Sequence, residues 1–207
     1  MSPGLAIPLA LLAAYVVGSI DFAVIVARMH GVDIHQAGSG NPGTSNVLRT
    51  LGRLPAAMVL VGDMLKGTVG AAMGWVASGV ADPSAVADPM GQWAFAAGFA
   101  AVIGHCYPIF HRFKGGKGVA TGAGVLLFTV PLAAVIELVL WGVIVKLTKT
   151  ASIGSLVIMV ITIPVLIWQG VGGASLVWVA LIIALIIWRH RGNIQRMVAG
   201  REPKVTT

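Results

Sequence analysis

The amino-acid sequence predicts an all-α, polytopic integral membrane protein with a single membrane-embedded domain over residues 1–207. Of its 207 residues, 57% are hydrophobic and only 10% are charged, and the mean hydropathy is +0.91. Soluble domains carry about 25% charged residues, so this composition excludes that class. A spanning helix needs about 20 mainly apolar residues. We expect seven spans, at 4–27, 55–78, 92–110, 118–130, 132–147, 153–169 and 173–189.

The first segment, 4–27, is interpreted as a spanning helix that is retained in the protein. It lacks the cationic region of a cleaved signal peptide, and its apolar run is longer than the hydrophobic region of such a peptide. Asp21 lies within this segment, and the sequence offers no reason for it.

The segments 118–130 and 132–147 are short for spanning helices, and Pro131 separates them. Five spans with a re-entrant middle are therefore the alternative to seven.

The basic residues indicate the orientation in the membrane. All fourteen Lys and Arg residues lie in or beside four segments, 28–54, 105–117, 147–152 and 190–207, with Lys66 the deepest in a predicted span. The loops "SGVADPSAVADPMG" and "QGVGG" contain none. Because cytoplasmic loops carry an excess of Lys and Arg, we predict an outside N-terminus and a cytoplasmic C-terminus. Arg28, Arg201 and Lys204 are interpreted as anchors to anionic lipid.

The stretch "GSGNPGTSN" has Gly38, Gly40 and Gly43 at the G-x-G-x-x-G spacing of dinucleotide-binding turns. That motif requires a preceding β-strand and an acidic residue about 20 residues further on. Here the preceding apolar run is helical, and Asp63 falls inside the next apolar segment. The nucleotide interpretation is rejected. Glycines beside Ser39, Asn41 and Asn46, with Arg49 close behind, still suit an anion, because a bare backbone N–H approaches phosphate closely.

The stretch "FKGGKGVAT" is similar to the end of a nucleotide-binding P-loop but fails its pattern. His111 stands where that motif needs a glycine, and Gly118 stands where it needs Ser or Thr. We nevertheless expect backbone amides at Gly115 and Gly116, the Lys117 ammonium and a helix that begins near Gly118 to surround one anion.

Each of the four cationic segments also carries Gly, Ser or Asn, which suggests one shared site for a phosphate-bearing substrate. A transporter of phosphorylated solutes is a second functional class, but it usually places its polar groups near the midplane in repeated halves. A scaffold protein is a third class, and it has no use for four such segments.

Several stretches resemble, in order and spacing, the bacterial acyl-phosphate:glycerol-3-phosphate acyltransferases, the PlsY family. They are "YVVGSI", "GSGNPGTSNVLRTLG", "DMLKG", "GHCYPIFHRFKGGKGVAT", "SIGS" and "RHRGNIQRMVAGRE". The resemblance covers Tyr15 to Glu202. It implies transfer of a fatty acyl group from acyl phosphate to the 1-hydroxyl of glycerol 3-phosphate, giving lysophosphatidic acid and phosphate. It also implies a location in a bacterial plasma membrane, with the active site on the cytoplasmic face, and a link to a soluble enzyme that produces acyl phosphate.

The resemblance also implies roles for individual residues. Lys117, Arg49 and Ser39 are the expected catalytic residues, and acyl phosphate is held by Ser39, Asn41 and Lys117. Glycerol 3-phosphate is held by Arg49, Lys117, Ser152, His190 and Asn193. The expected substrate-binding residues in full are Gly38, Gly40, Asn41, Asn46, Gly115, Gly116, Gly118, Ser152, His190 and Asn193.

Some of these residues have structural alternatives. Ser39, Ser152 and Asn193 are also suited to capping a turn or a helix, and His190 is equally suited to capping a helix C-terminus or to acting as a base.

Three residues are expected to support the site: His105 as a tie to the second loop, and Asp63 with Lys66 as an ion pair one turn apart. Glu137 is a lone acidic residue in an apolar segment, and its role stays open. The single cysteine, Cys106, is expected to pack in the interior. We expect no metal, no cofactor and no nucleic-acid partner.

Overall fold

A computed structural model of the chain describes residues 3–79 and 91–205, and within these ranges the chain is helical with no strand. The predicted outer loop at 78–91 lies almost wholly outside them. The helices are α1 (Pro3–Gly18), α2 (Phe22–Met29), α3 (Thr44–Leu51), α4 (Arg53–Ser78), α5 (Gln92–Cys106), the 3₁₀ turn η2 (Ile109–His111), α6 (Val119–Thr129), α7 (Pro131–Thr148), α8 (Ala151–Trp168), α9 (Gly173–Arg189) and α10 (Arg191–Val198).

Five helical segments among the described residues are long and apolar enough to cross a membrane, and six if α9 and α10 count as one bent span. The helix expected at 118–130 forms as α6, but it has only 11 residues. At 1.5 Å per residue it is about 16 Å long, roughly half the hydrocarbon thickness. The count of seven spans is therefore not confirmed, and the orientation of the termini stays a prediction.

The first predicted span is interrupted, and Asp21 explains how. Helix α1 ends at Gly18 and α2 begins at Phe22. The Asp21 side chain caps α2 by accepting a hydrogen bond from the Val24 amide at 3.1 Å. The Ile20 carbonyl at the break accepts a hydrogen bond from Lys66 Nζ at 2.7 Å. The side chains of Asp21 and Lys66 thus pair with backbone groups that would otherwise have no hydrogen-bond partner in an apolar environment.

Helix α4 lies at the centre of the bundle, against α1, α5 and α6. Its packing depends on small residues: a Cβ added at Gly67 would lie 2.0 Å from the Thr121 carbonyl oxygen of α6, and one at Gly124 would lie 1.9 Å from that of Met64. Lipid tails are as apolar as the helices, so spanning helices gain little from leaving lipid. They associate instead through close backbone contact at small residues such as glycine.

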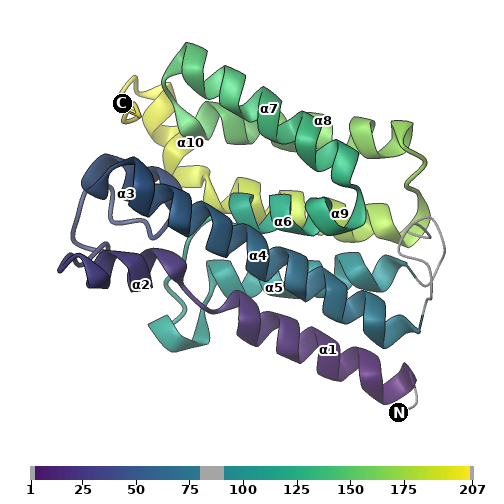
Figure 1. The fold of residues 1–207 in the computed structure, drawn as a ribbon. Coiled ribbons are helices and arrows are strands. Elements are labelled where there is room, and N and C mark those ends of the chain that lie inside the picture. Colours follow the sequence, from purple (N-terminus) through teal and green to yellow (C-terminus); the bar gives the residue numbers. More distant parts are fainter. Residues whose placement is uncertain (1–2, 80–90, 206–207) are drawn as a thin grey trace.

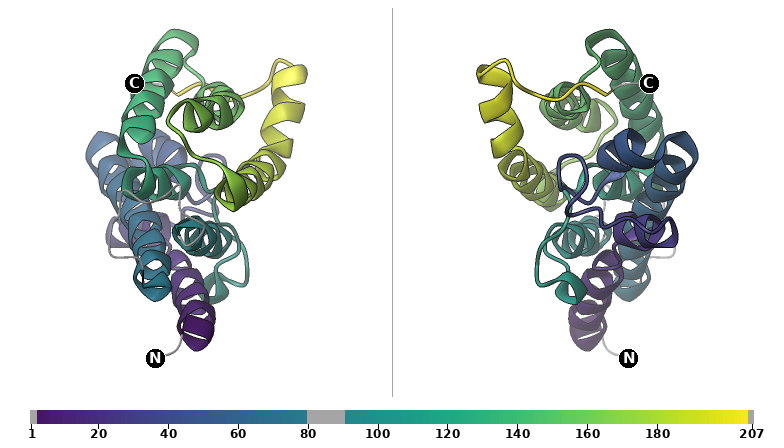
Figure 2. Two further views of the ribbon diagram at one scale, coloured as in Figure 1. Left: turned by 90° about the vertical axis from the view of Figure 1, so that its right-hand side faces the viewer. Right: turned by 90° about the vertical axis from the view of Figure 1, so that its left-hand side faces the viewer.

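The four cationic segments lie at one end of the bundle, together with α2, α3, α10 and the C-terminus (Figure 1). The N-terminus lies at the opposite end. The end-on views in Figure 2 show α7 and α8 standing apart from α4 and α5, with α9 and α10 along the side of the space between them. That space contains the candidate site.

Candidate active site

One cavity of about 470 Å³ opens among the cationic segments and continues between the helices. We call its charged part the polar end; it is lined by Ser39, Asn41, Arg49, Lys117, Ser152, His190, Asn193, Arg196 and Glu202. We call the remainder the apolar arm; its lining includes Leu126, Glu137, Trp141, Ile158, Met159, Thr162, Val179 and Ile182. The cavity thus joins a cationic site to a channel between α6, α7, α8 and α9.

The loop at residues 38–46 is held in place by Asn46, which is buried at the start of α3. Its Oδ1 accepts a hydrogen bond from the Ser39 amide at 2.8 Å, and its Nδ2 donates to the Ala37 carbonyl at 2.9 Å. Although Asn46 borders the cavity, its amide is therefore used to brace the loop. The bracing places the Ser39 hydroxyl where it accepts a hydrogen bond from Arg49 Nη2 at 3.1 Å.

Gly38 and Gly40 shape this loop and do not line the cavity. Both adopt left-handed backbone angles, with φ of +57° and +69°. A Cβ at Gly38 would lie 2.3 Å from Asn46 Oδ1, and one at Gly40 would lie 2.9 Å from the His35 carbonyl oxygen. Their position favours a role in the conformation of the loop over a direct approach to phosphate.

The second loop is fixed to the end of α9 by Arg189. The Arg189 side chain donates to the carbonyls of Gly115 and Gly116 at 2.7 and 3.0 Å. The Gly116 amide donates to the His105 carbonyl at 3.1 Å. Neither glycine lines the cavity, so both position Lys117 and do not contact its contents. Helix α6 begins at Val119, as expected, directly after Gly118.

Lys117 projects into the polar end and donates to the side-chain oxygen of Asn193. Burial removes water from the ammonium and is the main cause that lowers the pKa of Lys117 to about 8. Glu202 opposes this effect, and the nearby arginines add to it. A phosphate group placed here would restore the charge balance.

Glu202 is one of the polar-end residues to which the sequence assigned no role. Its carboxylate accepts hydrogen bonds from Ser152 Oγ at 2.7 Å, from Asn193 Nδ2 and from Arg196 Nε at 2.8 Å. These donors, headed by the Asn193 amide, lower the pKa of Glu202 against the opposing effect of burial. The C-terminal segment thereby joins α8 to α10 across the site. Glu202 is the last residue of the stretch "RHRGNIQRMVAGRE", which was the signal, but no role was assigned to it.

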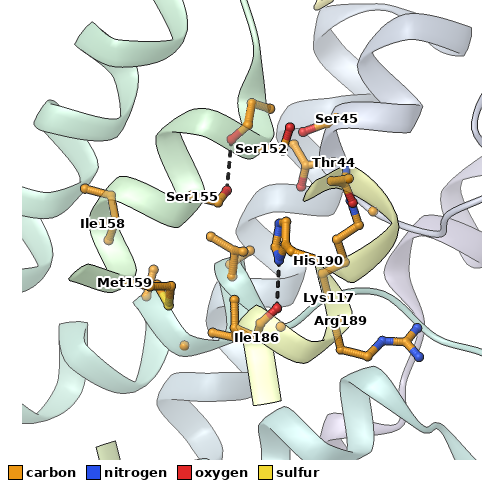
Figure 3. Close-up of a pocket in the computed structure, with 18 of the residues that line it drawn as sticks. Thr44, Ser45, Lys117, Ser152, Ser155, Ile158, Met159, Ile186, Arg189 and His190 are labelled. Atoms are coloured by element: carbon orange, nitrogen blue, oxygen red, sulfur yellow. Dashed lines mark hydrogen bonds between the residues drawn. The ribbon is translucent and has the colours of Figure 1, made fainter. Parts of the chain in front are cut away.

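His190 lies at the bend of 52° between α9 and α10 and is almost fully buried. Its Nδ1 contacts the Ile186 carbonyl oxygen at 2.8 Å. When Nδ1 donates that hydrogen bond, Nε2 is an acceptor. Figure 3 shows this contact, with Ser152 and Ser155 of α8 across the cavity from Lys117 and His190.

The predicted ion pair between Asp63 and Lys66 is confirmed, with 2.8 Å between Oδ1 and Nζ. His105 Nδ1 lies 3.5 Å from the same Asp63 oxygen. All three side chains are buried, and they connect α4 to α5 beneath the polar end. Lys66 itself does not line the cavity.

The structure brings most of the expected residues to one cavity. Those that line it are Ser39, Asn41, Asn46, Arg49, Asp63, His105, Lys117, Gly118, Ser152, His190 and Asn193. Those that do not are Gly38, Gly40, Gly115, Gly116 and Lys66. The main additions are Arg189, Arg196 and Glu202, which all fall in the C-terminal stretch "RHRGNIQRMVAGRE", and Thr44 and Ser45 of "GTSN".

The chain is similar to known proteins along most of its length. A family model described as glycerol-3-phosphate acyltransferase matches residues 8–200. The glycerol-3-phosphate acyltransferase of Pseudomonas paraeruginosa is 42% identical over 191 residues, which cover 91% of this chain and 94% of that protein. The enzyme of the same name from Halorhodospira halophila is 40% identical and covers 92% of each chain.

Two solved structures of PlsY (YgiH), an integral membrane glycerol 3-phosphate acyltransferase, are also similar, at 34% sequence identity. The glycerol 3-phosphate form has a TM-score of 0.86 and covers 97% of this chain and 96% of that chain. The lysophosphatidic acid form has a TM-score of 0.84 and covers 96% of this chain and 94% of that chain.

Proposed function

This chain belongs to the glycerol-3-phosphate acyltransferase family, and on that premise we propose that it transfers a fatty acyl group from acyl phosphate to the 1-hydroxyl of glycerol 3-phosphate. The products are lysophosphatidic acid and inorganic phosphate. One observation carries the proposal: a single cavity joins a cationic, hydroxyl-bearing end to an apolar arm between helices. Both substrates carry phosphate, and the donor also carries a long tail.

The reaction needs positioning and charge neutralisation more than a protein nucleophile. The glycerol hydroxyl attacks the carbonyl carbon of the donor, the bond between that carbon and the phosphate oxygen breaks, and phosphate leaves. Acyl phosphate is already activated, so the protein must hold two anions that repel each other and stabilise the charge that develops on the leaving group.

The contacts at the polar end support a division of roles. Lys117 is shared between the two phosphates, and Ser39 and Asn41 hold the acyl phosphate. Arg49 is half-buried beside Ser39, and its planar guanidinium suits two phosphate oxygens of glycerol 3-phosphate.

The acceptor's remaining contacts come from Ser152, Asn193 and His190. The His190 Nε2 accepts a hydrogen bond from a glycerol hydroxyl, because Nδ1 is occupied by the Ile186 carbonyl.

The proposal places the site at the cytoplasmic face of a bacterial plasma membrane. The cationic end of the bundle would lie there under the positive-inside rule, and glycerol 3-phosphate is a soluble solute. The apolar arm would accept the acyl tail from the membrane interior. A soluble enzyme that produces acyl phosphate would supply the donor.

The test is acyl transfer by the purified protein in detergent or lipid, with labelled glycerol 3-phosphate and either acyl phosphate or acyl-CoA as donor. We expect labelled lysophosphatidate from acyl phosphate and none from acyl-CoA. Product from acyl-CoA alone would contradict the proposed donor. Uptake of a phosphorylated solute into vesicles without any product would favour a transporter.

A further inference from the structure

The apolar arm contains a carboxyl group that the reaction does not use. Glu137 lines the cavity from α7, and only 6% of the residue is exposed. Among the described residues, its Oε1 has no hydrogen-bond partner. The Thr162 side chain of α8 lies beside the carboxyl and lines the same part of the arm. A buried carboxyl that faces a cavity without a full set of partners depends on what fills that cavity.

The distance of Glu137 and Thr162 from the polar end follows from the position of Thr162 on α8. Thr162 lies ten residues beyond Ser152 on α8, which corresponds to about 15 Å at 1.5 Å per residue. An extended hydrocarbon chain with bonds of about 1.5 Å advances roughly 1.25 Å per bond, so about twelve bonds cover this distance. Ile158 and Met159 line the arm and lie between Ser152 and Thr162 in the sequence of α8. Figure 3 shows them farther along α8 than Ser152 and Ser155. Short acyl chains therefore end before Glu137, and long ones reach it.

The contents of the arm then decide how the carboxyl is solvated. With a short chain bound, water remains in the arm beside the part of Glu137 that lines the cavity. A long saturated chain displaces that water and offers no donor or acceptor, so the polar group is left unpaired, which is unfavourable. The penalty applies only to chains that reach the pair.

We infer that Glu137, with Thr162, forms a polar subsite in the apolar arm that determines acyl-chain selectivity by disfavouring saturated chains that extend past it. The inference rests on the proposed function in taking the arm as the acyl-binding channel. It assigns Glu137 to specificity and not to the chemical step, because it lies far from the polar end. Replacing the carboxyl by an apolar group of similar size removes the penalty.

The experiment compares kcat/KM for decanoyl and hexadecanoyl phosphate in the wild type and in variants. For Glu137→Leu we expect the ratio of the long donor to the short donor to rise roughly tenfold relative to wild type. Glu137→Gln keeps a polar group at the same place and should leave the ratio within about threefold of wild type. Glu137→Met is a second apolar variant. Val139→Leu is the matched control: Val139 is on the same helix, is exposed and does not line the cavity, so the ratio should stay unchanged.

A second readout separates this inference from the proposed donor. Binding of decanoyl and hexadecanoyl glycerol 3-phosphate is measured for the same variants, and this requires no turnover. The affinity ratio should shift toward the long chain in Glu137→Leu even if acyl phosphate proves to be the wrong donor. Ratios for Glu137→Leu and Glu137→Met that match wild type in both assays would overturn the subsite.

Discussion

Lys117 combines three features that distinguish it from the hydroxyl side chains at the polar end. It carries a positive charge, it is half-buried, and it follows a loop that Arg189 fixes through the carbonyls of Gly115 and Gly116. An ammonium held in a partly dehydrated place stabilises a departing phosphate more strongly than it would in water. Catalysis should therefore depend on this side chain more than on any one hydroxyl of the site.

Lys117→Met keeps the length of the side chain and removes the charge. We expect acyl transfer to fall at least roughly 100-fold, because a preorganised charge on the leaving group is lost. Size-exclusion elution and thermal unfolding should match wild type and show that the protein remains folded. Transfer within about tenfold of wild type would remove Lys117 from the catalytic site.

The lowered pKa of Lys117, about 8, predicts an alkaline limit on activity. As pH rises through 8, the free enzyme loses the ammonium, so kcat/KM should fall. For stability the sign is opposite. Between about 8 and 10.5 the unfolded chain binds more protons at this lysine, so its contribution to the free energy of unfolding rises with pH.

The measurement is the pH profile of kcat/KM in wild type and in Lys117→Arg. If the variant is active, its alkaline limb should move above about pH 10, because guanidinium stays protonated there. An unchanged limb in an active variant would assign the titration to another group.

Arg49→Lys keeps the charge and removes the planar pair of donors. We expect the KM for glycerol 3-phosphate to rise roughly tenfold or more and the KM for acyl phosphate to change less. The reason is that the two-donor contact of the Arg49 guanidinium is assigned to glycerol 3-phosphate alone. Steady-state kinetics with each substrate varied in turn provide the measurement. Equal increases for both substrates would mean that Arg49 mainly shapes the loop through Ser39.

At the scale of elements, the sequence predicted the loops better than the helices that carry them. The two glycine-rich loops and the C-terminal "RHRGN" stretch were recognisable because Gly, Ser, Asn and Arg at those spacings have few uses in an apolar chain. The break between α1 and α2 was missed because Asp21 was left without a role in a segment interpreted as one span. The structure shows that its side chain caps the start of α2. The bracing roles of Asn46 and Arg189 depend on tertiary hydrogen bonds that no local pattern encodes.

The loop at 38–46 is tested by Gly40→Ala. Gly40 has a φ of +69°, and a Cβ there would lie 2.9 Å from the His35 carbonyl oxygen. We expect this change to destabilise the protein by about 1 kcal/mol or more and to lower activity, because the loop that aligns Ser39 with Arg49 is strained.

Thr44→Ala is the matched comparison in the same loop, because the Thr44 hydroxyl has no hydrogen-bond partner among the described residues. Its melting temperature should stay near wild type. Tm and specific activity are measured on the same purified samples. A Gly40→Ala protein with wild-type Tm and activity would contradict the bracing account.

At the scale of the whole molecule, function follows from how two layers meet. Helices α4, α5 and α6 pack closely through small residues, whereas α7 and α8 stand apart and leave a channel that opens at the cationic end. Composition was enough to predict a helical membrane protein, because no soluble core requires such hydropathy. It was not enough to count the spans, because α6 is apolar along its length yet too short to cross a bilayer alone.

The most direct test of the account is the stoichiometry of the reaction in one purified preparation. Inorganic phosphate and lysophosphatidate are measured together after acyl phosphate and glycerol 3-phosphate are added. If both substrates meet in this cavity, one phosphate is released for each lysophosphatidate formed, and both products disappear in Lys117→Met. Phosphate release that continues at the same rate without glycerol 3-phosphate, or no lysophosphatidate from an intact wild-type protein, would contradict direct transfer between the two substrates.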